Sequence, residues 1–231
     1  MARLPKSQRI EVETSSGPAW IDLDRADGGR LLIIGHGAGG SVDAPDILAV
    51  RRECVAVGIS VARITQPYRV AGKKAPPAAP TLDAAWAAVT DVLARRRGLT
   101  GLDVTYAGRS SGARVACRTA TVAVEQGWRR PPDSVVCLAF PVHPPGKPES
   151  SRLGELDPVP VPVMIVQGVS DPFGMPPDAP GRTVLAVPGD HGLKASASAA
   201  GELVAQWLAE RSAGGDVGQP AVGQSEKIGR R

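Results

Sequence analysis

The chain of 231 residues is long enough for one α/β domain with a sizeable core. Hydrophobic residues make up 42% of it but aromatic residues only 3%, so Ala, Val and Leu must fill most of that core. The net charge of +4 comes without a long Lys/Arg block or interleaved aromatics, and no apolar run approaches a membrane span. The sequence therefore predicts neither a nucleic-acid partner nor a membrane partner.

The N-terminus and the cysteines predict a cytoplasmic protein. Residues 1–13 contain no apolar stretch of the kind found in a signal peptide. Cys54, Cys117 and Cys137 lie in apolar segments and form no paired motif, which is typical of reduced cysteines in a core.

Hydrophobic periodicity predicts an N-terminal hairpin followed by alternating strands and helices. Residues 9–14 and 19–24 alternate and predict an edge hairpin, whereas 30–34 is a continuous apolar run typical of a strand buried on both faces. A helix is expected from Asp43, as N-cap, to about Val57, and residues 65–80 are expected to form a loop. Further strands are expected at 59–64, 102–107, 134–140, 161–168 and 182–187, and further helices at 82–97 (capped by Thr81), 113–124 and 193–211.

Such alternation predicts a mainly parallel sheet covered by helices on both faces, which is an α/β fold. We expect an N-terminal extension at residues 1–8, one domain at 9–211 and a disordered tail at 212–231, because the tail is Gly/Ser/Gln-rich and only weakly apolar.

A glycine-rich turn, residues 35–40, follows the buried strand. It could cradle a phosphate, but it lacks the P-loop lysine and does not have the dinucleotide-binding spacing. Its His-Gly-Ala-Gly-Gly form fits an oxyanion-hole turn, with a plain tight turn as the alternative. We interpret His36 as structural rather than catalytic.

The stretch Gly108-Arg109-Ser110-Ser111-Gly112 has the form G-x-S-x-G between an expected strand and an expected helix. That context is typical of a nucleophile elbow, in which side chains at the two glycine positions would collide with neighbouring backbone. A Gly/Ser-rich connecting turn is the alternative.

Two more polar turns, containing Asp171 and His191, also follow expected strands. The carboxyl ends of parallel strands lie at one edge of a sheet, so we expect both turns to meet the elbow. The order Ser110, Asp171, His191 is the one found in α/β-hydrolases. Other acids in the region are less suitable, because Asp190 adjoins His191 and because Asp157 and Asp178 lie in Pro-rich loops.

Over about residues 9–211, the chain resembles a single-domain α/β-hydrolase of the dienelactone-hydrolase-like superfamily. The closest resemblance is to the family that includes a testis-expressed hydrolase-like protein and a subunit of a chromatin acetyltransferase complex, some members of which have obscure or lost activity. The motifs that carry it are residues 36–40, 108–116, 140–147, 167–168, 171–174 and 190–191.

Acyl-transfer chemistry assigns a role to each candidate. Ser110 would be the nucleophile, His191 its general base and Asp171 the group that orients the imidazole. Backbone N–H groups of Ser111 and of Ala38 (or Gly39) would bind the oxyanion. His143 could line an acyl pocket or be an ordinary histidine of a Pro-rich loop, and we favour the second reading.

The sequence therefore predicts a serine hydrolase that cleaves an ester or related bond of a small acyl substrate, with no lid domain, no cofactor and no metal. The alternative is a catalytically silent hydrolase-like domain used for binding or assembly. Arg69, Lys73 and Lys74, on the loop before a helix, add the hypothesis that the entrance prefers anionic substrates.

The predicted tail leads to a simple test. Because residues after about position 212 lack apolar periodicity, deleting them should leave the thermal midpoint nearly unchanged. A drop of many degrees would show that the tail packs against the core.

Overall fold

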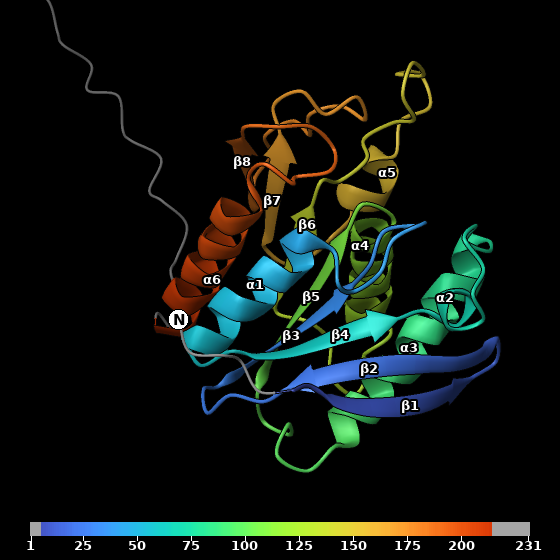
Figure 1. Cartoon of the computed structure of the whole chain (residues 1–231), viewed down its shortest axis with the longest axis vertical. Coiled ribbons are helices and arrows are strands. Elements are labelled where there is room, and N and C mark those ends of the chain that lie inside the picture. Colours follow the sequence, from blue (N-terminus) through green and yellow to red (C-terminus); the bar gives the residue numbers. More distant parts are fainter. Residues whose placement is uncertain (1–5, 214–231) are drawn as a thin grey trace, which may run out of the picture.

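The computed structural model describes residues 6–213, and within them one eight-stranded sheet forms the middle layer (Figure 1). Its strand order is β1-β2-β4-β3-β5-β6-β7-β8. The strands are β1 (Gln8–Thr14), β2 (Gly17–Asp24), β3 (Arg30–Gly35), β4 (Ser60–Thr65), β5 (Asp103–Arg109), β6 (Ser134–Leu138), β7 (Val163–Gly168) and β8 (Arg182–Val187).

The β1–β2 pair is the predicted antiparallel edge hairpin, and β2 pairs antiparallel with β4. Every pairing from β4 onward along the sheet is parallel. The prediction of a mostly parallel sheet with an N-terminal hairpin is therefore confirmed.

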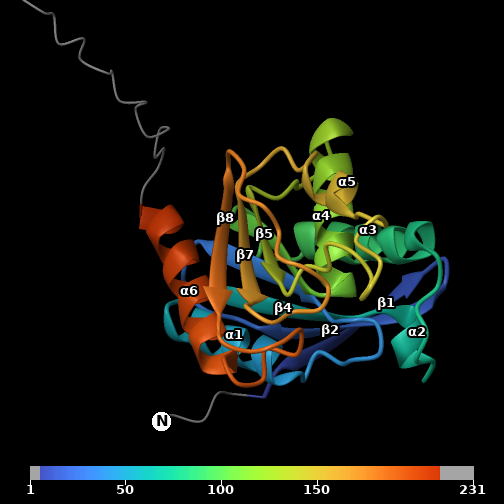
Figure 2. The ribbon, with the colours of Figure 1, turned by 90° about the horizontal axis from the view of Figure 1, so that it is seen from above.

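Helices cover both faces of the sheet, and Figure 2 shows α1 and α6 on one side and α3 and α4 on the other. No inserted segment between residues 6 and 213 forms a lid domain. The helices are α1 (Pro45–Ala56), α2 (Pro67–Val70), α3 (Ala79–Arg95), α4 (Ser111–Glu125), α5 (Leu153–Leu156) and α6 (Ala197–Ala213).

Strand β3 divides the core into two layers. Leu31 and Ile33 belong to the apolar cluster under α3 and α4, whereas Leu32 and Ile34 belong to the cluster under α1 and α6. All four side chains are buried. Burying such a side chain contributes about 1.5–3 kcal/mol, so the continuous apolar run fixes β3 at the centre of the sheet.

The expected starts of α1, α3 and α6 were wrong, whereas the other helix boundaries differ from the expected ones by one or two residues. Helix α1 has Ala44 as its N-cap, because the Asp43 carboxylate pairs with Arg63 instead, at 2.7 Å. Helix α3 begins at Ala79 and not after Thr81, because proline is compatible with a first helical turn and Pro80 lies there. Helix α6 begins at Ala197 and not at Leu193, which has a φ of +50° that no α-helix accommodates.

Two short helices were also missed. The segment predicted as a loop at 65–80 contains α2, and α5 lies in the Pro-rich region before β7. Each has only four residues, which is too short for a hydrophobic period to be recognisable in the sequence.

Most of the predicted extension at 1–8 and of the predicted tail at 212–231 lies outside the described residues. Ser212 and Ala213 belong to α6, and the buried Arg30 donates from Nε to Ser212 Oγ at 3.1 Å. A deletion that tests the tail should therefore begin at residue 214.

All three cysteines are buried free thiols, as predicted. Burial raises the pKa of the Cys54 thiol to about 12. The structure adds that Cys117 on α4 and Cys137 on β6 lie side by side, with their Sγ atoms 3.6 Å apart. Among residues 6–213, no helix has the length and hydrophobicity needed to cross a bilayer.

Helices α1 and α6 pack closely because residue 201 has no side chain. A Cβ atom on Gly201 would lie 2.7 Å from the carbonyl carbon of Ala49. We predict that Gly201→Ala destabilises the protein by about 1–3 kcal/mol in urea unfolding, since rigid backbone must move.

Gly154→Ala on α5 is the matched control, because nothing lies within 4 Å of the added Cβ. It should be neutral or stabilising by up to about 1 kcal/mol, because alanine favours a helix more than glycine does. Equal effects of the two substitutions would contradict the close approach of α1 and α6.

Candidate active site

Ser110 lies on a strained turn between β5 and α4. Its φ is +54° and its ψ is −112°, a conformation that is uncommon for any residue with a side chain. The Ser110 amide donates to the carbonyl oxygen of Leu138 at 2.8 Å, which ties the turn to the end of the neighbouring strand β6. The surrounding structure therefore stabilises a backbone conformation that costs about 1–3 kcal/mol on its own.

The two glycines of the elbow allow its backbone to touch the adjacent segments. A Cβ on Gly108 would overlap the backbone of Gly112. A Cβ on Gly112 would lie 2.7 Å from the carbonyl oxygens of both Gly35 and His36. The elbow and the glycine-rich turn after β3 are thus in direct backbone contact, and this contact requires glycine.

The structure brings Ser110, His191 and Asp171 together at the carboxyl ends of β5, β8 and β7. His191 Nε2 lies 2.8 Å from Ser110 Oγ, and His191 Nδ1 lies 2.8 Å from Asp171 Oδ2. We call this chain of hydrogen bonds the Ser–His–Asp array. A carboxylate at Nδ1 keeps the proton there and leaves Nε2 free to accept the serine proton.

Asp171 is held by partners that the sequence analysis missed. Its Oδ1 accepts the backbone N–H of Phe173 at 2.8 Å, and its Oδ2 accepts Gln167 Nε2 at 2.8 Å. The Gln167 amide also lies within bonding distance of the carbonyl oxygens of Phe140 and Gly174. Because the Asp171 side chain is only 1% exposed, these donors fix the position of its carboxylate.

The imidazole of His191 is covered by an aromatic ring. Phe173 stacks on it with a centroid distance of 4.0 Å and an interplanar angle of 29°. The ring limits rotation of the imidazole and shields one of its faces from water. The same short loop thus supplies the acid and a cover for the histidine.

The glycine-rich turn lies beside the elbow and is also held by two side chains of α2. Tyr68 Oη donates to the carbonyl oxygen of Ala38 at 2.6 Å, and Arg69 Nε donates to that of Gly40 at 2.9 Å. Burial raises the pKa of the Tyr68 hydroxyl, so it remains a donor at neutral pH. Ser111 is the first residue of α4, where backbone N–H groups have no acceptor within the helix.

The preference of the entrance for anionic substrates stays a prediction, because the Arg69 guanidinium keeps its charge when it bonds to backbone carbonyl groups. A second N–H group of its guanidinium donates to the carbonyl oxygen of Lys73 at 2.9 Å. Arg69 therefore holds two backbone carbonyl groups in place.

His36 is structural, in agreement with our interpretation of the sequence. It is buried, its Nε2 accepts the amide of Gln66 at 3.1 Å, and its Nδ1 donates to the carbonyl oxygen of Gly37 at 2.8 Å. Both ring nitrogens are occupied, so neither faces a substrate.

His143 contacts the loop that carries Asp171. Its amide donates to the carbonyl oxygen of Phe173 at 3.1 Å, and its Nδ1 lies 2.9 Å from the carbonyl oxygen of Pro144. Its ring also packs against Gly174, where a Cβ would lie 2.7 Å from Nε2. His143 therefore packs against the loop that holds the acid of the array.

Two other candidate acids have different partners. Asp190 accepts the amide of Gly192 at 2.8 Å, and Asp157 pairs with Arg182 at 2.6 Å. Among residues 6–213, no group of three or more His, Cys, Asp or Glu side chains is arranged to hold a metal ion.

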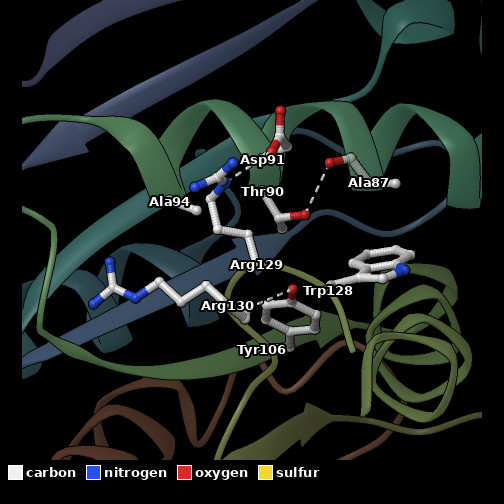
Figure 3. Close-up of a pocket in the computed structure, with 8 residues that line it drawn as sticks. All are labelled: Ala87, Thr90, Asp91, Ala94, Tyr106, Trp128, Arg129 and Arg130. Carbon is white, nitrogen blue, oxygen red and sulfur yellow. Dashed lines mark hydrogen bonds and ion pairs between the residues drawn. The ribbon is translucent and has the colours of Figure 1, made fainter. Parts of the chain in front are cut away.

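A cavity of about 270 Å³ lies elsewhere, between α3 and the loop after α4. Figure 3 shows Tyr106 and Trp128 facing α3, with Arg130 beside the tyrosine hydroxyl. The loop precedes β6 and so lies near the amino ends of the strands, whereas the array lies at their carboxyl ends. The cavity is thus separate from the candidate active site.

A family model described as an alpha/beta hydrolase domain matches residues 28–209, and the chain belongs to that family. The match includes the glycine-rich turn, the elbow and all three residues of the array. No curated protein matches the chain significantly.

Solved structures of hydrolases share the fold at low sequence identity. Est1E from Butyrivibrio proteoclasticus has a TM-score of 0.71 and 17% identity, with 90% of this chain and 100% of that chain covered. XC6422 from Xanthomonas campestris, described as a serine hydrolase without a lid, has a TM-score of 0.67, 19% identity and coverage of 91% and 98%. A dienelactone hydrolase from Anabaena variabilis has a TM-score of 0.66, 18% identity and coverage of 90% and 97%. The likeness confirms the α/β-hydrolase fold.

Buried His36 makes stability depend on pH. Burial lowers the pKa of His36 below 6.5, although its bond to Gly37 opposes the shift. As the pH falls through about 6.5, the unfolded chain then binds more protons than the folded chain. The free energy of unfolding therefore decreases on acidification.

We predict that His36→Asn, which removes this titration, is less stable than the wild type at pH 8, and that the gap narrows toward pH 5. Urea unfolding of both proteins at several pH values measures the gap. A gap that stays constant would show that His36 is not held neutral.

Proposed function

We propose that this protein is a serine hydrolase that cleaves an ester or related acyl bond through a covalent acyl-enzyme. One observation carries the proposal: two successive hydrogen bonds of 2.8 Å connect Ser110, on its strained elbow, with His191 and Asp171. Membership of the alpha/beta hydrolase domain family supports a hydrolytic activity of this kind.

The proton transfers follow from this geometry. Ser110 Oγ attacks the acyl carbon while its proton passes to His191 Nε2. The imidazolium is stabilised by Asp171 and then protonates the leaving group as the acyl-enzyme forms. A water molecule next gives a proton to Nε2 and attacks the acyl carbon, and the same proton returns to Ser110 as the acid is released. The cycle consumes one water molecule and needs no cofactor or metal.

The oxyanion of each tetrahedral intermediate would accept hydrogen bonds from the backbone N–H of Ser111 and of Ala38 (or Gly39). Such donors each stabilise the transition state by roughly 3–4 kcal/mol in other hydrolases. The bond from Tyr68 to the carbonyl oxygen of Ala38 fixes the Ala38–Gly39 peptide, whose N–H belongs to Gly39, so it supports Gly39 as the second donor.

We infer a small or extended acyl substrate, because no lid domain covers the array in residues 6–213. Est1E has been solved with ferulic acid bound, and a dienelactone hydrolase shares the fold, so aromatic esters and lactones belong in a first substrate panel. Gly39 and His143 remain candidate substrate contacts. The buried free thiols are compatible with the proposed cytoplasmic location.

A catalytically silent domain is the competing proposal, and it rests on the resemblance to the family with the testis-expressed protein and the acetyltransferase-complex subunit. The array favours hydrolysis over this alternative, because an assembly role does not require a serine, a histidine and a buried carboxylate in hydrogen-bonding order.

We predict that Ser110→Ala and His191→Ala abolish turnover of p-nitrophenyl esters. Asp171→Asn should lower kcat about 10⁴-fold, because the amide no longer holds the proton at Nδ1. Asp190→Asn is the matched control, and it should cost much less, since among residues 6–213 its carboxylate bonds only to the amide of Gly192 in the same loop.

The acid assignment fails if an active enzyme keeps nearly full kcat after Asp171→Asn while Asp190→Asn or Asp157→Asn silences it. The silent-domain proposal is favoured if the folded wild type hydrolyses no ester and Ser110 resists a fluorophosphonate probe.

A further inference from the structure

Arg109, the residue before Ser110, contacts three segments around the array. Its Nη2 donates to the backbone carbonyl oxygen of His191 at 2.9 Å. Its Nε lies 3.5 Å from Oδ2 of Asp46, in the first turn of α1. Its side chain also fills the space beside Gly37, where a Cβ would lie 3.0 Å from Nη1 and 3.3 Å from Cδ. One side chain therefore connects the elbow, α1, the glycine-rich turn and the histidine loop.

Asp46 is the counter-charge that orients the Arg109 guanidinium. Its side chain is 1% exposed, and its Oδ1 accepts the amide of Ile47 at 3.0 Å. Its Oδ2 and Arg109 Nε have no hydrogen-bond partner among the described residues, so the two groups meet as an ion pair at 3.5 Å. Burial raises the pKa of the Asp46 carboxyl, and the positive charge of Arg109 opposes that shift. A buried carboxylate left without its cation is strongly unfavourable, which keeps the guanidinium near α1.

The histidine loop needs such a support. His191 lies between β8 and α6, in a segment without regular secondary structure. Its side chain must keep two hydrogen bonds in place at once, and a displacement of about 1 Å can cost a factor of 10² in rate. The bond from Arg109 holds the backbone of the residue whose side chain makes those two contacts.

We propose that Arg109, oriented by Asp46, is a positioning residue that fixes the backbone of His191 relative to Ser110. This inference rests on the proposed hydrolase function for its effect on turnover. Its structural consequence, the ordering of the histidine loop, can be measured without turnover.

The first test is Arg109→Ala with added guanidinium ion. We expect kcat for p-nitrophenyl acetate to fall by about 10²-fold with little change in KM, because the histidine is displaced and not the substrate. Millimolar guanidinium chloride should restore much of the lost kcat by occupying the site beside Asp46, whereas sodium chloride and urea should not.

Arg118→Ala is the matched control. Arg118 is on α4, is 18% exposed against 22% for Arg109, and makes a two-pronged ion pair with Asp83 away from the array. Its loss should leave kcat and its response to guanidinium unchanged.

A second variant separates positioning from stability. Arg109→Met combined with Asp46→Leu removes both charges and leaves no unpaired buried carboxylate, so the thermal midpoint should stay close to that of the wild type. We expect kcat to remain as low as in Arg109→Ala, and hydrogen–deuterium exchange to be faster in the peptide that covers residues 188–192. The proposal is overturned if this folded double variant exchanges and turns over like the wild type.

The two proposals fail in different ways. The wild type could hydrolyse no ester while the Arg109 variants still exchange faster than it does. That result would support the Arg109 contact and refute the hydrolase function. An active wild type whose folded Arg109 variants keep full kcat and unchanged exchange would refute the Arg109 proposal alone.

Discussion

The backbone contact between the elbow and the glycine-rich turn is the constraint on which the site depends. Gly112 lies against the carbonyl oxygens of Gly35 and His36, at a distance that no Cβ permits. This contact holds Ser110 at a φ of +54° and places its hydroxyl above the carboxyl ends of β3 and β5. The strain at Ser110 persists because the surrounding sheet is buried on both faces and cannot relax around it.

The remaining parts of the site are positioned by side chains that take no direct part in the proposed chemistry. Gln167 and the amide of Phe173 hold the acid, and Tyr68 holds the turn at Ala38. Arg109 connects that turn to the histidine loop. These supports come from β7 and the loop after it, from α2 and from the end of β5, so the array is a property of the packed sheet and not of any single loop.

The architecture and the candidate residues could be predicted from the sequence because they depend on local patterns. The run at residues 30–34 specifies a central strand, and strand topology places the turns that contain Ser110 and His191 at one edge of the sheet. The starts of α3 and α6 could not be predicted. Pro80 fits a loop as well as it fits the first turn of a helix, and no local pattern indicates the positive φ of Leu193. The contacts of Gln167 and Arg109 were missed because they depend on distances between segments far apart in the chain. The one local indication was a polar glutamine next to the last residue of the otherwise apolar strand β7.

We propose that this packing makes Ser110, and no other serine, nucleophilic. Mass spectrometry of the protein after reaction with a fluorophosphonate tests it directly, with peptide mapping of the adduct. The account predicts one phosphonyl group per chain, located on Ser110 and absent from unfolded protein, where the array does not form. An unmodified folded protein, or an adduct on another residue, would contradict it.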